Sequence, residues 1–122
     1  MEKERFEELV AQALDGVPTA LREKMENVAI MVQDWPTPRQ LREAEIRNRQ
    51  DLFGLYEGIP LPKRSSGYNM VLPDQITIFQ KAIEMHCRTD GRIIRKIRGT
   101  LHHEIAHYFG ISDARLREIG RY

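Results

Sequence analysis

The sequence predicts an α+β domain with few strands, on the basis of its length, its composition and its apolar patterning. The chain has 122 residues, an ordinary size for one domain, so we expect residues 1–122 to form a single folded unit. Its composition is 41% hydrophobic and 30% charged, as in globular proteins, and its net charge is only +1. This balance argues against a general nucleic-acid or membrane-surface binder, which would carry a large excess of basic residues.

The N-terminal segment predicts two helices. Apolar residues recur at helical spacing over residues 2–15, and Gly16 and Pro18 end that pattern. Thr19 is expected to cap a second, short helix that runs to about Met25. The amphipathic pattern of the first helix predicts that one of its sides packs against a core.

The next segment predicts a strand, a surface helix and a long loop. Residues 28–32 form a short apolar run rich in β-branched side chains, which is typical of a buried strand. Thr37 is expected to cap a charged helix over 39–50, whose narrow apolar stripe places it on the surface. Residues 52–74 contain glycines and prolines among apolar residues, and we expect a loop that packs against the body of the domain.

The C-terminal half predicts one further strand and three helices. Alternating apolar residues predict a strand over 75–80, and residues 81–87 have helical spacing. The longest predicted helix covers 92–109, and Gly110 ends it. A last short helix is expected over 112–119, with a serine as its cap.

Two histidines one turn apart on the longest predicted helix carry the main chemical signal. His103 and His107 are at positions i and i+4, so both imidazoles project from one face of the helix. This spacing suits two ligands of one tetrahedral zinc ion. Glu104 points about 100° around the helix from His103. There it could reach a metal-bound water as a general base without binding the metal itself.

Two later positions extend this pattern to a third ligand. The helix must end soon after His107 if the chain is to turn back to the metal, and Gly110 can adopt the left-handed conformation that makes this turn at low cost. Asp113 would then supply an oxygen ligand and leave a fourth position for water, as in an open catalytic zinc site. The alternative is a simple helix end followed by an ordinary acidic residue.

A helical wheel separates the two histidines from the side of the helix that faces the core. The predicted core stripe consists of Ile94, Ile97, Leu101, Ile105 and Tyr108. His103 and His107 fall on another side, with Thr100 between them, so we expect them to face a cleft. His102 points in a further direction, and we expect it to face solvent or to support the ligands from behind rather than bind the metal.

Residues 103–113, with the sequence HEIAHYFGISD, resemble the HExxHxxGxxD form of the metzincin zinc-peptidase signature, in which aspartate replaces the usual third histidine. Nearly the whole chain is similar to the bacterial family of small zincin-like metallopeptidases, also described as minimal metzincin-like domains. The resemblance includes residues 55–61, residues 73–78, and residues 98–101 leading into the motif.

The resemblance implies a minimal zincin-like fold, in which a small mixed sheet packs on helices that include the HExxH helix. It implies that His103, His107 and Asp113 bind Zn²⁺ and that Glu104 is the catalytic base. The implied reaction is hydrolysis of a peptide or protein substrate by metal-activated water. The predicted strand over 75–80 could pair with such an extended peptide beside the metal.

After the motif, the chain departs from full-size metzincins. No methionine follows Asp113, so the methionine turn beneath the metal is absent, and only nine residues remain. The candidates for a group that stabilises an oxyanion are Tyr56, Tyr68, Tyr108 and Tyr122. We therefore expect an open, shallow site that could need a particular substrate, a partner or a second copy to complete it.

Two other functions stay open. Small bacterial rRNA-processing endonucleases use the same histidine spacing, but with glycine at the position of Glu104 and histidine at that of Asp113. The basic segment 88–98 favours RNA binding, although a basic helix surface balanced by the acidic segment 1–26 is the simpler explanation. The other alternative is a non-catalytic, zincin-shaped binding module whose metal is structural.

The same sequence predicts a cytoplasmic protein. Its N-terminus has no apolar secretory signal, and the longest fully apolar run, over 28–32, is far shorter than the roughly 20 residues of a membrane span. Cys87 is the only cysteine, so no internal disulfide can form. We expect a peptide or protein partner, no membrane partner and no nucleic acid.

Overall fold

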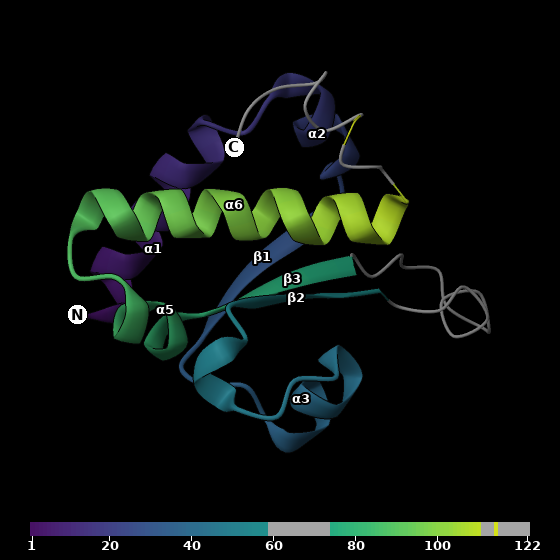
Figure 1. The fold of residues 1–122 in the computed structure, drawn as a ribbon. Coiled ribbons are helices and arrows are strands. Elements are labelled where there is room, and N and C mark those ends of the chain that lie inside the picture. The colour runs from purple at the N-terminus through teal and green to yellow at the C-terminus, as the bar shows by residue number, and fades with distance from the viewer. Residues whose placement is uncertain (59–73, 111–113, 115–122) are drawn as a thin grey trace, which may run out of the picture.

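A computed structural model describes residues 1–58, 74–110 and 114, and in this part of the chain helices surround a small mixed sheet (Figure 1). The α-helices are α1 (Lys3–Asp15), α2 (Thr19–Lys24), α3 (Pro38–Ala44), α5 (Gln80–His86) and α6 (Asp90–Phe109). The strands are β1 (Val28–Gln33), β2 (Gly54–Glu57) and β3 (Asp74–Phe79), and Arg49–Asp51 form the 3-10 helix η1. The predicted α+β class is therefore confirmed.

The three strands follow the order β1–β3–β2, so β3 lies in the centre of the sheet. β1 is parallel to β3, and β2 is antiparallel to it, with Gly54 opposite Ile78. The sequence predicted a loop over 52–74, and β2 corrects the first part of that prediction. The strand was missed because it has only four residues, begins with a glycine and is followed by Gly58.

Helices cover both faces of the sheet. Ile76 and Ile78 of β3 face the layer formed by α1 and α6, while Phe79 packs in a second apolar cluster with residues of α3. Because successive residues of a strand point to opposite faces, this arrangement explains why residues 76–79 are all buried. A strand buried on both faces fits the centre of the sheet and not its edge.

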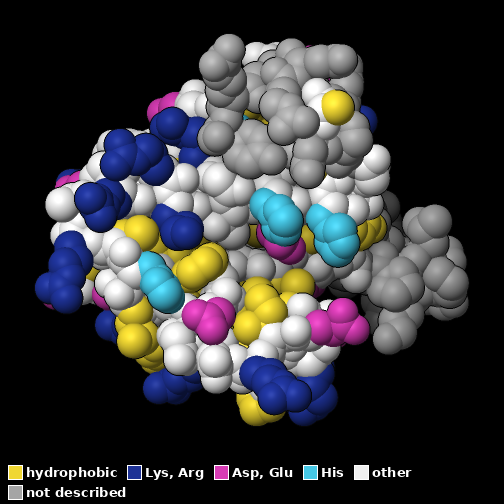
Figure 2. Space-filling model, in the orientation of Figure 1, with side chains coloured by type: hydrophobic (Ala, Val, Ile, Leu, Met, Phe, Trp, Pro, Cys, Tyr) yellow, Lys and Arg dark blue, Asp and Glu magenta, His cyan; other side chains and the backbone are white. Residues whose placement is uncertain are grey.

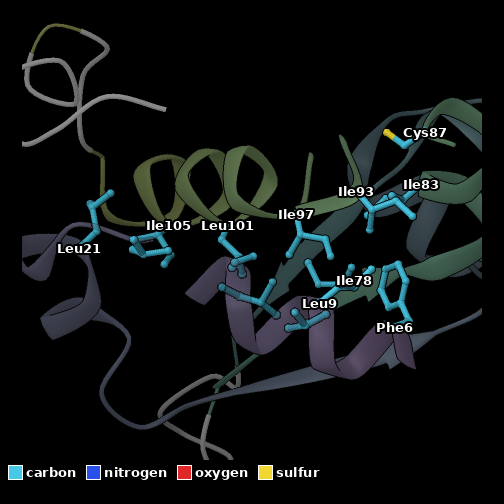
Figure 3. Packing of buried hydrophobic residues seen from close by; sticks show 14 of the residues in the cluster. Phe6, Leu9, Leu21, Ile78, Ile83, Cys87, Ile93, Ile97, Leu101 and Ile105 are labelled. Atoms are coloured by element: carbon cyan, nitrogen blue, oxygen red, sulfur yellow. The ribbon is translucent and has the colours of Figure 1, made fainter. Parts of the chain in front are cut away.

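The main core lies between α6 and α1, where apolar side chains of both helices meet those of β3 (Figure 3). α6 contributes a buried stripe that consists of Ile93, Ile97, Leu101 and Ile105. The sequence also placed Ile94 and Tyr108 in this stripe, but neither side chain is fully buried. Ile94 is only partly buried at the margin of the core. Tyr108 is 49% exposed because it lies in the last turn of α6, opposite Gly58 and past the end of β2.

The helix predicted over 39–50 is shorter in the structure. As predicted, Thr37 caps it, and the side chains of Thr37 and Gln40 form reciprocal hydrogen bonds with each other's backbone amides. α3 then ends at Glu45, which adopts a left-handed conformation with φ of 58°. The single turn of η1 replaces the rest of the expected helix.

The remaining boundaries agree with the sequence to within a few residues. Thr19 is the first residue of α2 and not its cap, because Pro18 occupies the capping position. α6 begins at Asp90, slightly earlier than predicted, and the helix expected over 112–119 falls outside the described residues, apart from residue 114. No helix in the described ranges is long and apolar enough to cross a membrane.

Candidate active site

The two histidines predicted as metal ligands lie together on the exposed side of α6. The ring centroids of His103 and His107 are 6.4 Å apart, and their planes are inclined by 15°. Both side chains are exposed, as expected, and in Figure 2 histidine side chains stand next to each other over α6. The helix therefore presents two imidazoles in the same direction, which is a suitable donor pair for zinc.

The sequence around α6 fixes both of its ends. The Thr89 hydroxyl accepts a hydrogen bond from the amide of Arg92 (3.2 Å) and caps the start of the helix. Gly110 ends it in the predicted left-handed conformation, with φ of 68°. Asp113 lies outside the described residues. Within the described ranges, no three His, Cys, Asp or Glu side chains are grouped to hold a metal ion, so this part of the chain contributes two of the three predicted ligands.

The Glu104 carboxylate lies where α6 meets the sheet. Its Oε1 accepts a hydrogen bond from the backbone amide of Tyr56 in β2, at 2.9 Å. This bond connects the predicted base to the sheet and fixes its place beside the two histidines. The sequence did not predict this partner, because it is 48 residues away and lies in the segment expected to be a loop. The only local signal was the short apolar stretch around Leu55.

β2 forms an edge of the described sheet on the side of the histidines. The sequence predicted that residues 75–80 could pair with an extended peptide, and the structure shows that this is wrong. β3 is paired with β1 on one side and with β2 on the other, so its backbone groups are already used. The strand beside the candidate site is β2.

The antiparallel register decides which backbone groups of β2 face the site. The amide of Phe79 donates to the carbonyl of Phe53 at 2.9 Å. Alternation along the antiparallel pair then turns the backbone groups of Gly54 and Tyr56 away from β3. The hydrogen bond from Tyr56 to Glu104 follows this direction.

The surroundings of Glu104 change its acidity. Burial raises the pKa of its carboxyl above the ordinary value, and this effect outweighs the hydrogen bond from Tyr56 and the nearby His103 and His107, which lower it. A carboxyl group with a raised pKa is better suited to accept a proton and then to release it near neutral pH.

The tyrosines proposed for an oxyanion have other contacts in the structure. The Tyr56 hydroxyl donates to Oδ2 of Asp74 at 2.9 Å, and the Tyr56 ring stacks on that of Tyr108 with centroids 3.8 Å apart. The two rings thus form an aromatic wall at the C-terminal end of α6. Tyr68 and Tyr122 lie outside the described residues.

Of the two positions predicted for His102, the solvent-facing one is wrong, because its side chain is completely buried. Support of the ligands from behind stays a prediction. α1 and α2 both pack along α6 and cover a wider side of the helix than a single stripe. Burial, together with the positive charge of Arg98, lowers the pKa of His102 to about 4. Its imidazole is therefore neutral at pH 7 and belongs to the packed side of α6.

A groove of about 660 Å³ begins at His103 and Glu104 and extends toward the N-terminal end of α6. α6 forms one side of it, and residues 51–54 with the end of α5 form the other. Figure 2 shows apolar side chains between these two sides and basic side chains over the N-terminal half of α6. The predicted cleft is therefore present beside His103, whereas His107 is not among the residues that line it.

Comparison with known families agrees with this arrangement. A family model described as zincin-like metallopeptidase matches residues 25–121, a range that contains all three strands and the whole of α6. Among curated proteins, no significant match was found. The match confirms the resemblance that the sequence motif indicated. Taken with the mixed sheet and the histidine helix, it shows that the chain belongs to the zincin-like metallopeptidase family.

Proposed function

We propose that the protein is a zinc-dependent peptidase in which His103, His107 and Asp113 hold Zn²⁺ and Glu104 is the general base. One observation carries the proposal: the Glu104 carboxylate lies beside two exposed imidazoles and is held by a backbone amide of the edge strand β2. The proposed base, the two proposed metal donors and a strand that could bind a peptide therefore lie close together, which supports the proposal.

The donor set of this chain fits zinc. Imidazole nitrogens and a carboxylate oxygen are common zinc ligands, and three protein ligands leave a fourth position open, as in catalytic sites. His103 and His107 are exposed and point the same way, so a metal ion could reach both. When bound, zinc supplies Lewis-acid activation of water and of the substrate carbonyl.

Glu104 would move the proton. Its Oε1 is engaged by the amide of Tyr56, while Oε2 accepts no hydrogen bond from the described residues. Oε2 is thus the oxygen that would take a proton from the attacking water and deliver it to the nitrogen of the leaving amine. The raised pKa of the carboxyl favours this transfer, because the protonated form is less costly than for an exposed glutamate.

The backbone of β2 would position the substrate. The backbone amide and carbonyl of Gly54 point outward from the edge of the described sheet and would pair with an extended peptide that adds there. In this mode of recognition, main-chain hydrogen bonds supply affinity and side-chain pockets supply specificity. The groove along α6 continues directly from this edge.

Glu104→Gln tests the catalytic claim, because it keeps the shape of the side chain and removes the base. The zinc-loaded proteins are incubated with a broad peptide pool, and the products are identified by mass spectrometry. We expect the wild type to cleave and Glu104→Gln to be slower by about 10²–10⁴-fold with unchanged zinc content. Equal inactivity of both zinc-loaded proteins would reject the peptidase proposal.

Replacement of His107 tests the metal site, and His86 provides a matched control. His86 is also an exposed histidine and lies in the same groove, but it is far from the motif in sequence. We expect His107→Ala to lose tight zinc binding in elemental analysis, because one of three protein ligands is removed, and His86→Ala to keep it. Equal zinc content in the two variants would contradict the ligand assignment.

A metal-dependent endoribonuclease is the second candidate. Three basic residues, Arg92, Arg95 and Lys96, line the groove beside the histidines and could contact RNA phosphates. Cleavage of RNA by the zinc-loaded wild type, lost in His107→Ala, would favour this candidate over the peptidase. If the protein binds zinc but cleaves neither peptides nor RNA, that result would favour a zincin-shaped binding module.

A further inference from the structure

We infer that the basic end of the groove is a subsite for acidic peptide substrates and selects carboxylates three to five residues from the scissile bond, on its C-terminal side. The inference rests on the proposed peptidase function, and it names the substrate class for that site. It depends on the order of residues along α6, on the charges at one end of the groove, and on the direction of β2.

One face of α6 lines the groove over its whole length. The residues it contributes follow the helical repeat: Arg92, Arg95, Lys96, Gly99, Thr100, His103 and Glu104. The charge of this face therefore changes along the helix: the cations lie near the N-terminal end of the groove, and His103 and Glu104 lie at its other end. A substrate held at the histidines would extend over the cations.

The cations are available to a ligand. Arg92 and Arg95 are exposed, and in the described part of the chain neither they nor Lys96 form an ion pair. The Lys96 ammonium lies over the Phe53 ring, 4.4 Å from its centroid, which holds this charge at the apolar floor of the groove. Among the lining residues, the acidic Asp51 is 3.9 Å from His86 Nε2. The N-terminal end of the groove is thus positively charged, with an apolar floor.

β2 and α6 run in the same direction, which sets the polarity of the substrate. A side chain on Gly54 would meet Thr100, the Tyr56 amide binds Glu104, and a side chain on Gly58 would meet Tyr108. Each step of two residues along the strand thus corresponds to four along the helix. An antiparallel partner of β2, the slightly more stable pairing, would run toward the N-terminal end of α6 and place its C-terminal residues over the cations.

The spacing follows from standard geometry. Lys96 and Arg92 precede His103 by seven and eleven residues, which is roughly 10 and 16 Å along a helix that rises about 1.5 Å per residue. An extended peptide advances about 3.3 Å per residue. The two cations therefore lie roughly three and five peptide residues from the metal position.

A peptide fits the groove better than RNA for two reasons. The groove begins at Gly54 of β2, whose outward backbone amide and carbonyl match another strand at the edge of the described sheet. The apolar floor formed by Leu52 and Phe53 can bury side chains between the carboxylates. The binding test below includes a single-stranded RNA oligonucleotide, so that RNA can be compared directly with the peptide.

The experiment measures binding separately from cleavage. Zinc-loaded Glu104→Gln is titrated, by fluorescence anisotropy, against fluorescein-labelled peptides that reach from the histidines to Arg92. Three peptides differ only in their C-terminal half, which carries glutamate, glutamine or lysine. We expect the glutamate peptide to bind about tenfold more tightly than the glutamine peptide, and the lysine peptide to bind most weakly.

Charge reversal locates the subsite. In the Glu104→Gln background, Arg92→Glu with Arg95→Glu should abolish the preference for glutamate, whereas Lys3→Glu with Arg22→Glu should leave it intact. The control pair has the same change of net charge, and its residues are exposed and outside the groove. Equal loss of preference in both double variants would mean a general charge effect and would overturn the subsite.

Gly99 supplies a steric version of the same test. A Cβ at Gly99 or at Gly91 would meet no atom within 4 Å, but only Gly99 lines the groove. We expect Gly99→Leu to weaken binding of the glutamate peptide at least about fivefold, because a large side chain would fill the groove, and Gly91→Leu to leave it unchanged. If Gly99→Leu and Gly91→Leu weaken binding of the glutamate peptide equally, the placement of the peptide in the groove would be overturned.

The outcomes separate this inference from the proposed function. Cleavage of all three peptides at equal rates by the wild type, with equal binding, would keep the peptidase and overturn the acidic subsite. Preferential binding of the glutamate peptide without any cleavage would support the subsite and reject the peptidase. A preference for glutamate on the N-terminal side would support the subsite and overturn its direction. Tighter binding of a single-stranded RNA oligonucleotide, lost in Arg92→Glu with Arg95→Glu, would overturn the peptide as ligand.

Discussion

The two faces of the sheet are buried by different means. On the face toward α1 and α6, Ile78 of β3 is completely buried in an apolar core. On the face toward α3, an apolar cluster around Phe79 adjoins polar side chains: Glu57 accepts hydrogen bonds from Thr77 at 2.9 Å and from Gln40 at 3.1 Å. Thr77 is only 1% exposed and Gln40 only 3%, so water hardly competes for these bonds.

This difference shows how the candidate site is supported from two sides. We call the core between the sheet and α1 and α6 the apolar layer, and the hydrogen-bonded side chains on the face toward α3 the polar layer. β2 presents Tyr56 to the apolar layer and Glu57 to the polar layer. The Tyr56 amide holds Glu104, so the position of this proposed base depends on the short strand β2. We infer that the apolar layer supplies most of the stability, whereas the polar layer keeps a four-residue edge strand in register.

Truncation in the apolar layer should have the largest effect on stability. Ile97 on α6 is completely buried in the main core. We expect Ile97→Ala to lower the free energy of unfolding by about 3 kcal/mol, because it removes buried methyl groups and leaves a cavity. Urea unfolding followed by circular dichroism measures the change.

The control for this prediction lies on the opposite side of the same helix. Arg95 is exposed in the groove, and Arg95→Ala should change the free energy of unfolding by no more than about 0.5 kcal/mol. Similar losses in Ile97→Ala and Arg95→Ala would contradict the distinction between the packed and the open face of α6.

The apolar layer was largely predictable from sequence, because its signals are local. The helical spacing over residues 2–15 and 92–109 predicted α1 and α6, and the β-branched run over 28–32 predicted β1. The expectation that this strand is buried was wrong, because β1 lies at an edge of the described sheet and its residues are only partly buried or exposed. The same spacing placed His103 and His107 together on an open face, as the structure shows. Each of these inferences uses residues within one element.

The polar layer and the support of the base were not predictable, because they join distant residues. The bond from Thr77 to Glu57 spans 20 residues, and that from Tyr56 to Glu104 spans 48. Neither pairing leaves a periodic pattern in the sequence. His102 shows the same limit, because its burial depends on helices elsewhere in the chain that pack along α6.

Neutralising Glu57 should have a smaller and pH-dependent effect. Burial raises the pKa of this carboxyl, but hydrogen bonds from Thr77, Gln40, Arg39 and Gln75 lower it, and the net pKa is below the ordinary value. Its contribution is therefore present above the ordinary glutamate pKa and is lost as the pH falls through the folded-state pKa. We expect Glu57→Gln to cost about 1–2 kcal/mol at pH 7 and much less in acid, measured from urea midpoints at several pH values.

Glu26 is the matched control for this change, since it is exposed and forms no side-chain hydrogen bond with the described residues. Glu26→Gln should shift the urea midpoint little at any pH. A loss of stability in Glu57→Gln that is equal at pH 7 and in acid would show that the charge of the carboxylate does not hold the polar layer together.

The smallest effect is expected on the surface of α6 that neither layer covers. Gly99 is in the interior of the helix, and a Cβ there would meet no atom within 4 Å. Gly99→Ala should therefore raise the free energy of unfolding by about 0.5–1 kcal/mol, because alanine loses less backbone freedom on folding. Gly91→Ala should raise the free energy of unfolding by less, since Gly91 is in the first turn of α6. A loss of stability in Gly99→Ala would mean that this face is packed against protein and is not an open groove wall, and the groove would then have no room for a substrate beside the histidines.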